Sequence, residues 1–214
     1  YVRAQGTGPN PMPLVLTHGW PWTFWDLHKV IGPLADPAAH GGDPADSFDV
    51  IVPSLPGYGF SVPLATTGVD VPRIAELWVQ LMRDVLGYDR FGAQGGDWGA
   101  FVTGWLGHAH AQHLTGVYLS LPTIPGVLGK RGPRPEDFAP DEQWMVRRAE
   151  EARRVTEAHV AVHRRDPQTF AYAMADSPTG LGAWLWHRRQ AWCDGDALEV
   201  LRQPLEAGVV SIVR

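Results

Sequence analysis

The sequence has almost no cysteine and no long apolar run. Its 214 residues include one cysteine, Cys193, so no disulfide can form within the chain, which fits a reducing, cytoplasmic location. Every apolar run falls short of the roughly 20 residues that a membrane-spanning helix needs. The sequence opens without the charged and then apolar segment of a leader. We therefore expect a cytoplasmic protein with no membrane span.

A basic surface is lacking as well. The formal net charge is −5, from 18 Lys and Arg against 23 Asp and Glu, and the basic residues form no stripe. This argues against a nucleic-acid partner or a polybasic membrane patch. The hydrophobic content of 44% is enough for one sizeable core. The composition favours a small neutral substrate and leaves the oligomeric state open.

Short apolar runs alternate with helical periodicity in the first part of the chain. The runs end at glycine- or proline-containing turns, and the helical segments repeat apolar residues every three or four positions. The predicted strands are 13–17, 48–53, 88–94 and 114–119, and the predicted helices are 23–34, 71–86 and 101–110. This order is typical of an α/β fold with a mostly parallel sheet covered by helices on both faces.

The sequence changes character after the last predicted strand. Residues 1–122 carry the alternating pattern, whereas 123–140 are rich in proline and glycine and predict a linker. Apolar residues then recur at helical spacing from Met145 to Val162, and Ser177-Pro178 suits the start of a further helix. We expect residues 141–214 to form an incomplete helical cap.

A glycine-rich turn follows the predicted strand 88–94. In Gly95-Gly96-Asp97-Trp98-Gly99-Ala100, small residues surround one aspartate at a junction between a strand and a helix. A nucleophile elbow requires such small neighbours because its turn is sharp and strained. The amino end of the following helix also favours an ionised carboxylate. Glycine and aspartate form ordinary turns too, but the flanking strand and helix favour Asp97 as a nucleophile.

An aspartate in this position suits attack on saturated carbon. Its unperturbed pKa of about 3.9 leaves it ionised at neutral pH without a partner base. Displacement at an epoxide or halide carbon would give an alkyl ester, whose hydrolysis passes through an oxyanion. Backbone N–H groups are the usual oxyanion donors. We expect them from Trp98 and from Trp20, which lies in the turn His18-Gly19-Trp20-Pro21.

Three motifs together resemble a known family. They are His18-Gly19-Trp20-Pro21, Ser54-Leu55-Pro56-Gly57-Tyr58-Gly59-Phe60-Ser61 and Gly95-Gly96-Asp97-Trp98-Gly99, and further similarity runs through Asp176-Ser177-Pro178-Thr179-Gly180-Leu181 and Ala183-Trp184. The chain resembles the epoxide hydrolases of the α/β-hydrolase superfamily, particularly the microsomal-type group and its bacterial relatives, to about Asp196.

The resemblance implies a fold, a reaction and a set of site residues. Asp97 would open a small apolar epoxide through an ester that water hydrolyses to a vicinal diol, as in detoxification of foreign compounds. Trp20 and Trp98 would form the oxyanion hole. No cofactor or metal would be needed. The supporting turns would contain His18, Gly19, Pro21, Gly95, Gly96 and Gly99.

The sequence departs from the family pattern in two places. The resemblance implies cap tyrosines that donate to the epoxide oxygen, but the first aligns near His159, and Tyr172 is the nearest cap tyrosine. Core packing suits His159 better than a role near the substrate, because it lies on an apolar helix face. The stretch expected to carry the charge-relay acid and the water-activating histidine is absent from this sequence. We therefore expect slow or no turnover by these 214 residues, with an ester trapped on Asp97.

Other readings of these features stay open. His108, His110 and His113 suit a solvated helix end better than a metal site, since no carboxylate accompanies them. A haloalkane-type dehalogenase also uses an elbow aspartate and an ester, but it must hold a departing halide. The alternative that is not an enzyme is a catalytically incomplete fragment that only binds apolar ligands.

Overall fold

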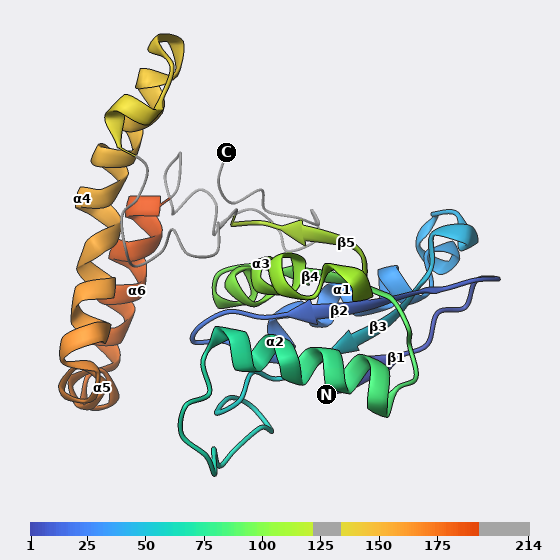
Figure 1. Ribbon diagram of the computed structural model, residues 1–214. Helices are drawn as coiled ribbons and strands as arrows, with labels where there is room; N and C mark the ends of the chain where they lie inside the picture. Colours follow the sequence, from blue (N-terminus) through green and yellow to red (C-terminus); the bar gives the residue numbers. More distant parts are fainter. Residues whose placement is uncertain (122–133, 193–214) are drawn as a thin grey trace. The chain divides into compact units, whose positions relative to one another are not determined.

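The computed structural model describes residues 1–121 and 134–192 and divides the chain into two compact units, 1–132 and 133–214. The first unit contains a sheet with helices, and the second contains helices (Figure 1). Cys193 and most of the predicted linker lie outside the described residues.

The first unit is built on a five-stranded sheet with the order β1-β3-β2-β4-β5. The three pairings β3–β2, β2–β4 and β4–β5 are parallel, and only β1 runs antiparallel to its neighbour β3. The strands are β1 (Val2–Ala4), β2 (Met12–Thr17), β3 (Phe48–Val52), β4 (Phe91–Gly95) and β5 (Leu114–Leu119). This confirms the predicted α/β fold with a mostly parallel sheet.

Helices pack on both faces of the sheet because its central strands are apolar on both sides. Val15 of β2 lies in a core cluster with residues of α2 (Val71–Gln80) and α3 (Trp98–Ala109). The next residue, Leu16, points to the opposite face and lies in a second cluster with α1 (His28–Ala35). This alternation follows from the period of two in a strand. The sheet is therefore a rigid layer that fixes the turns at its edge.

The element boundaries differ from the predicted ones in several places. A short 3-10 helix, Phe24–Leu27, precedes α1, and α2 continues into a π-helical turn at 81–85. β4 begins at Phe91 instead of residue 88, because the Tyr88 N–H donates to the Met82 carbonyl at the end of the preceding helical segment, at 2.9 Å. The Tyr88 hydroxyl donates to Asp49 of β3 at 2.6 Å. α3 begins directly after Asp97, earlier than the predicted residue 101.

The second unit consists of α4 (Gln143–Arg165), α5 (Pro167–Asp176) and α6 (Pro178–Trp192). Ser177 caps α6 as predicted, since its hydroxyl accepts the Gly180 N–H at 3.0 Å. Aromatic rings join the three helices. Trp184 of α6 lies 4.7 Å from Phe170 of α5 and 6.2 Å from His163 of α4, measured between ring centroids.

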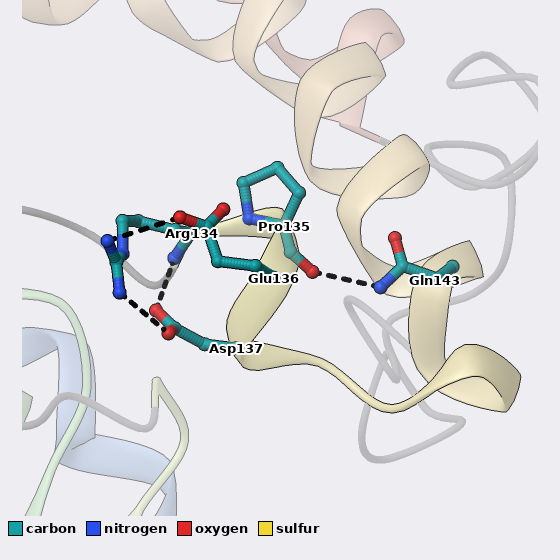
Figure 2. Close-up of polar contacts among 5 residues, drawn as sticks. All are labelled: Arg134, Pro135, Glu136, Asp137 and Gln143. Atoms are coloured by element: carbon teal, nitrogen blue, oxygen red, sulfur yellow. Dashed lines mark hydrogen bonds and ion pairs between the residues drawn. The ribbon is translucent and has the colours of Figure 1, made fainter.

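A polar turn precedes α4 (Figure 2). The Arg134 N–H donates to Asp137 at 2.8 Å, and the Arg134 guanidinium lies 3.1 Å from Glu136. The hydrogen bonds from Arg134 keep the pKa of Asp137 below its usual value. Gln143, the first residue of α4, donates to the Pro135 carbonyl at 2.9 Å. In the described ranges, no helix is both long and apolar enough to cross a bilayer.

Candidate active site

Two turns meet at one edge of the sheet. β2 and β4 are adjacent and parallel, and Thr17 at the end of β2 pairs with Gly95 at the end of β4. The turn His18–Pro21 follows β2, and Gly96-Asp97 follows β4. These two turns therefore leave the sheet side by side. This edge, at the carboxyl ends of parallel strands, is where open α/β sheets bind ligands.

Asp97 has the strained backbone of an elbow. Its φ is 51° and its ψ is −125°, and it is the only non-glycine residue with positive φ in the described part of the chain. Such conformations cost about 1–3 kcal/mol and are kept where the surroundings enforce them. Asp97 is also the residue before α3, so its side chain lies at the amino end of that helix.

The glycines around Asp97 are required by close backbone approach. A Cβ on Gly99 would collide with the carbonyl oxygen of Thr17, which belongs to the neighbouring strand. A Cβ on Gly19 would lie 2.5 Å from the Asp97 Cβ and 2.7 Å from Oδ1. Similar crowding excludes a side chain at Gly95, against the Gly99 carbonyl, and places one at Gly96 only 2.6 Å from the Ser120 hydroxyl. The two turns are thus packed backbone to backbone.

The Asp97 carboxylate already contacts one of the two predicted oxyanion donors. The Trp20 N–H donates to Asp97 Oδ1 at 2.8 Å. Trp98 is the first residue of α3, so its N–H belongs to the helix turn whose N–H groups have no partner within the helix. In the described part of the chain, no hydrogen bond reaches Asp97 Oδ2. One carboxylate oxygen is therefore held and the other is available.

His18 is buried beneath this turn and bonded at both ring nitrogens. Nδ1 lies 2.8 Å from the Gly19 carbonyl oxygen, and Nε2 accepts the Leu55 N–H at 2.9 Å. Burial lowers the pKa of His18, opposed in part by the Gly19 hydrogen bond and by the charge of Asp26. The predicted supporting residue Pro21 follows Trp20 through a cis peptide bond.

The segment 54–61 adds a residue that the sequence did not single out, Tyr58. Its ring meets the His18 ring edge-on, with centroids 5.8 Å apart. Burial raises the pKa of the Tyr58 hydroxyl, and the nearby negative charge of Asp97 raises it further. In the sequence, this segment was one of the three motifs that carry the family resemblance, and no contact was assigned to it. The segment lies in the sequence between the motifs 18–21 and 95–99, and this was the available signal that it contacts them.

Aromatic side chains are exposed around these turns. A hollow of about 550 Å³ adjoins the turn 18–21 at Pro21, and Trp25 stacks on His28 beside it with ring centroids 4.4 Å apart. Phe60 of the segment 54–61 is 87% exposed and stacks on Phe24. The residues lining the hollow are Pro21, Trp22, Thr23, Trp25, Asp26, His28 and Lys29.

The predicted cap residues lie in the other unit. Tyr172 is an exposed residue of α5. His159 of α4 is partly buried, and its ring lies 6.1 Å from that of His163. Burial lowers the pKa of His163, and the charge of His159 lowers it further. The roles of Tyr172 and His159 toward a substrate stay predictions.

The histidine cluster near the elbow helix lies far from Asp97. A helix rises about 1.5 Å per residue, so His108 is about 15 Å along α3 from Trp98. His110 and His113 come still later in the chain. Among the described residues, no three His, Cys, Asp or Glu side chains gather as a metal site would require.

Comparison with known proteins identifies relatives of this chain. Residues 12–192 match the family model described as alpha/beta hydrolase fold. The chain is 40% identical to a protein from Stigmatella aurantiaca provisionally named as an epoxide hydrolase, and 30% identical to epoxide hydrolase 1 of Oryctolagus cuniculus. These alignments cover 95% and 88% of this chain, but only 46% and 44% of the relatives.

A solved structure supports the same grouping. The structure of Aspergillus niger epoxide hydrolase is 28% identical to this chain and superimposes with a TM-score of 0.66. The match covers 91% of this chain and 49% of that one. The chain thus spans about half the length of the relatives that it resembles.

Proposed function

This chain belongs to the α/β-hydrolase fold family, and from that premise we propose that it carries the nucleophile of an epoxide hydrolase. The observation that supports this most directly is an aspartate, Asp97, at a strained elbow with one carboxylate oxygen bonded to the Trp20 N–H. The substrate would be a small apolar epoxide, in keeping with the exposed aromatic residues around the site.

In the first step, Asp97 Oδ2 attacks an epoxide carbon. A new bond forms between Oδ2 and that carbon, and the bond from the carbon to the ring oxygen breaks. The electron pair stays on the ring oxygen, which takes up a proton and becomes a hydroxyl of the ester intermediate. Oδ2 is assigned as the attacking atom because Oδ1 is held by Trp20. Tyr172 and His159 are the candidate proton donors from the cap.

In the second step, water attacks Cγ of the Asp97 ester and negative charge develops on Oδ1. The Trp20 N–H lies 2.8 Å from this atom before any reaction. Oxyanion donors act from about 2.7–3.1 Å, and losing one costs roughly 3 kcal/mol of transition-state stabilisation. Trp98 would supply the second N–H. Collapse of the intermediate breaks the ester bond. One proton of the attacking water passes to the departing oxygen and completes the diol, the other is released to solvent, and the carboxylate is restored.

Intact-mass measurement with styrene oxide tests this proposal. We expect the chain to gain the mass of one epoxide, and Asp97→Ala to gain none. Asp84→Ala, which removes an exposed carboxylate from the turn after α2, is the matched control and should react like the unchanged chain. An adduct that forms equally on Asp97→Ala would show that other carboxylates are alkylated and would reject Asp97 as the nucleophile.

A haloalkane substrate distinguishes the competing dehalogenase reaction. Trp98 directly follows the nucleophile and is 48% exposed, so its indole could assist a departing halide. We expect styrene oxide to react and 1-chlorobutane to release no chloride. Chloride release without reaction of the epoxide would assign the dehalogenase reaction instead. A folded chain that reacts with neither would favour the reading as a binding fragment.

A further inference from the structure

We propose that His18 is a positioning residue of the oxyanion hole, whose neutral ring holds the Gly19 carbonyl so that the N–H of the same peptide stays aimed at Asp97. The proposal rests on the ester mechanism above. It assigns the buried histidine a role in the reaction that goes through Trp20, without contact between the imidazole and substrate.

The first argument is the geometry of one peptide group. The carbonyl of Gly19 and the N–H of Trp20 belong to the same planar unit, and in a trans peptide they point in opposite directions. The carbonyl lies 2.8 Å from His18 Nδ1, and the N–H donates to Asp97 Oδ1 at 2.8 Å. A rotation of this peptide would lengthen both contacts together. The Trp22 N–H also donates to this carbonyl, at 3.1 Å, so His18 provides the shorter of its two contacts. Fixing the carbonyl fixes the oxyanion donor, and in variants without the Nδ1 donor only the Trp22 contact remains.

The second argument is that the surroundings specify one form of the ring. The Leu55 N–H donates to Nε2, so Nε2 must be without a proton. The neutral imidazole then carries its proton on Nδ1, which makes Nδ1 the donor to the Gly19 carbonyl. The tautomer is thus assigned from the partners on both sides of the ring. In a protonated ring, Nε2–H would face the Leu55 N–H, and two donors cannot form a hydrogen bond with each other.

The third argument is that the ring cannot move away from this position. His18 is 2% exposed, and Tyr58 covers it edge-on. A continuous chain of hydrogen bonds then runs from Leu55 through His18 and the Gly19–Trp20 peptide to Asp97. Hydrogen bonds in such chains polarise one another, which strengthens the terminal donor. The segments after β3, β2 and β4 are thereby joined at the nucleophile.

Two substitutions separate this role from simple packing. In His18→Asn the amide N–H lies near the place of Nδ1 and can still donate to the Gly19 carbonyl. In His18→Gln the amide lies near the place of Nε2, so its oxygen can accept from Leu55 while the donor to Gly19 is lost. Each variant keeps one of the two hydrogen bonds. A purely structural role would make their activities follow their stabilities.

The reaction to measure is cleavage of the Asp97 ester by hydroxylamine, after loading with styrene oxide. The hydroxylamine nitrogen attacks Cγ, the ester bond breaks, the diol leaves with a proton, and Asp97 is left as its hydroxamate. This step develops charge on Oδ1 and needs no base from the protein. We expect cleavage to be about tenfold or more slower in His18→Gln and within about threefold of the unchanged chain in His18→Asn.

Tyr88→Phe is the matched control, because it removes a hydrogen bond to Asp49 from another part of the same unit. It should lower the thermal midpoint without changing the cleavage rate. The Trp20 amide proton, followed by NMR, gives a readout without reaction and should move upfield in His18→Gln but not in His18→Asn. Equal cleavage rates in both His18 variants, or a slower His18→Asn, would overturn the role of His18. An unchanged chain that forms no ester would instead overturn the mechanism on which the proposal rests.

Discussion

At the scale of single residues, the site is an arrangement of backbone groups around one carboxylate. Gly19 and Asp97 lie so close that a Cβ on Gly19 would stand 2.7 Å from Oδ1, near the distance of the hydrogen bond from Trp20. The absence of a side chain at Gly19 is therefore as important to the site as the presence of the carboxylate. This closeness has a testable consequence.

We expect Gly19→Ala to displace Asp97 and to slow ester formation about 100-fold, since even small misplacement of reacting groups is costly. The rate of adduct formation with styrene oxide measures this effect. Gly116→Ala is the matched control, because a Cβ at Gly116 meets nothing within 4 Å. If both alanine variants react at the rate of the unchanged chain, the close packing of the two turns is not needed for the reaction.

The sequence predicted the residues of this site but not how they are connected. Asp97, Trp20 and His18 were predicted from glycine spacing and motif resemblance, because a strained turn restricts which residues can surround it, and their roles stay predictions. The hydrogen bond from Leu55 to His18 and the edge contact of Tyr58 were not predictable. They depend on how the segment after β3 folds back over β2, which local patterns do not encode.

At the scale of elements, the helices of the second unit depend on local signals that can be changed one at a time. Ser177 precedes α6 and accepts the Gly180 N–H, one of the groups that the helix cannot satisfy itself. Gly182 lies within the first turns of α6, is exposed, and has open space where a Cβ would stand. The two residues therefore have opposite effects on the same helix.

We expect Ser177→Ala to lower the stability of the helical unit by about 1 kcal/mol through loss of the cap. Gly182→Ala should raise it by roughly 0.5–1 kcal/mol, because alanine loses less backbone entropy in a helix. Urea unfolding followed by helical circular dichroism measures both changes. Effects of the same sign would show that α6 does not depend on the local signals at its beginning.

Helices and strands with a strong local sequence pattern were predicted, and those with a weak pattern were missed. The central strands were found because apolar runs ending at tight turns leave few alternatives. β1 has only three residues and gives no such pattern. Residues 88–90 were assigned to a strand on their composition, but the Tyr88 N–H donates to the Met82 carbonyl at the end of the preceding helical segment. α5 was not predicted, because the segment Pro167–Asp176 is short and mixes polar and apolar residues.

At the scale of the whole molecule, each unit contains a histidine that is stabilised in its neutral form, His18, which is buried, and His163, which is partly buried. Burial is the main cause that lowers the pKa of His18 in the first unit and of His163 in the second. Both pKa values in the folded chain lie below the ordinary value of 6.5. Between the folded and unfolded values, the unfolded chain binds more protons. Stability therefore rises with pH in this window.

We expect the urea midpoint to be constant above pH 7 and to fall as the pH decreases below about 6.5, where the unfolded histidines become protonated first. Asp137 adds nothing here, because its pKa is lowered from a value of 3.8 and it titrates only in stronger acid. His18→Gln should flatten the dependence in the first unit, since glutamine cannot take up the proton. Unfolding curves from pH 5 to 8, recorded for the unchanged chain and for this variant, give the measurement. A midpoint that rises on acidification would mean that the buried histidines are charged in the folded chain, and the neutral tautomer assigned to His18 would be wrong.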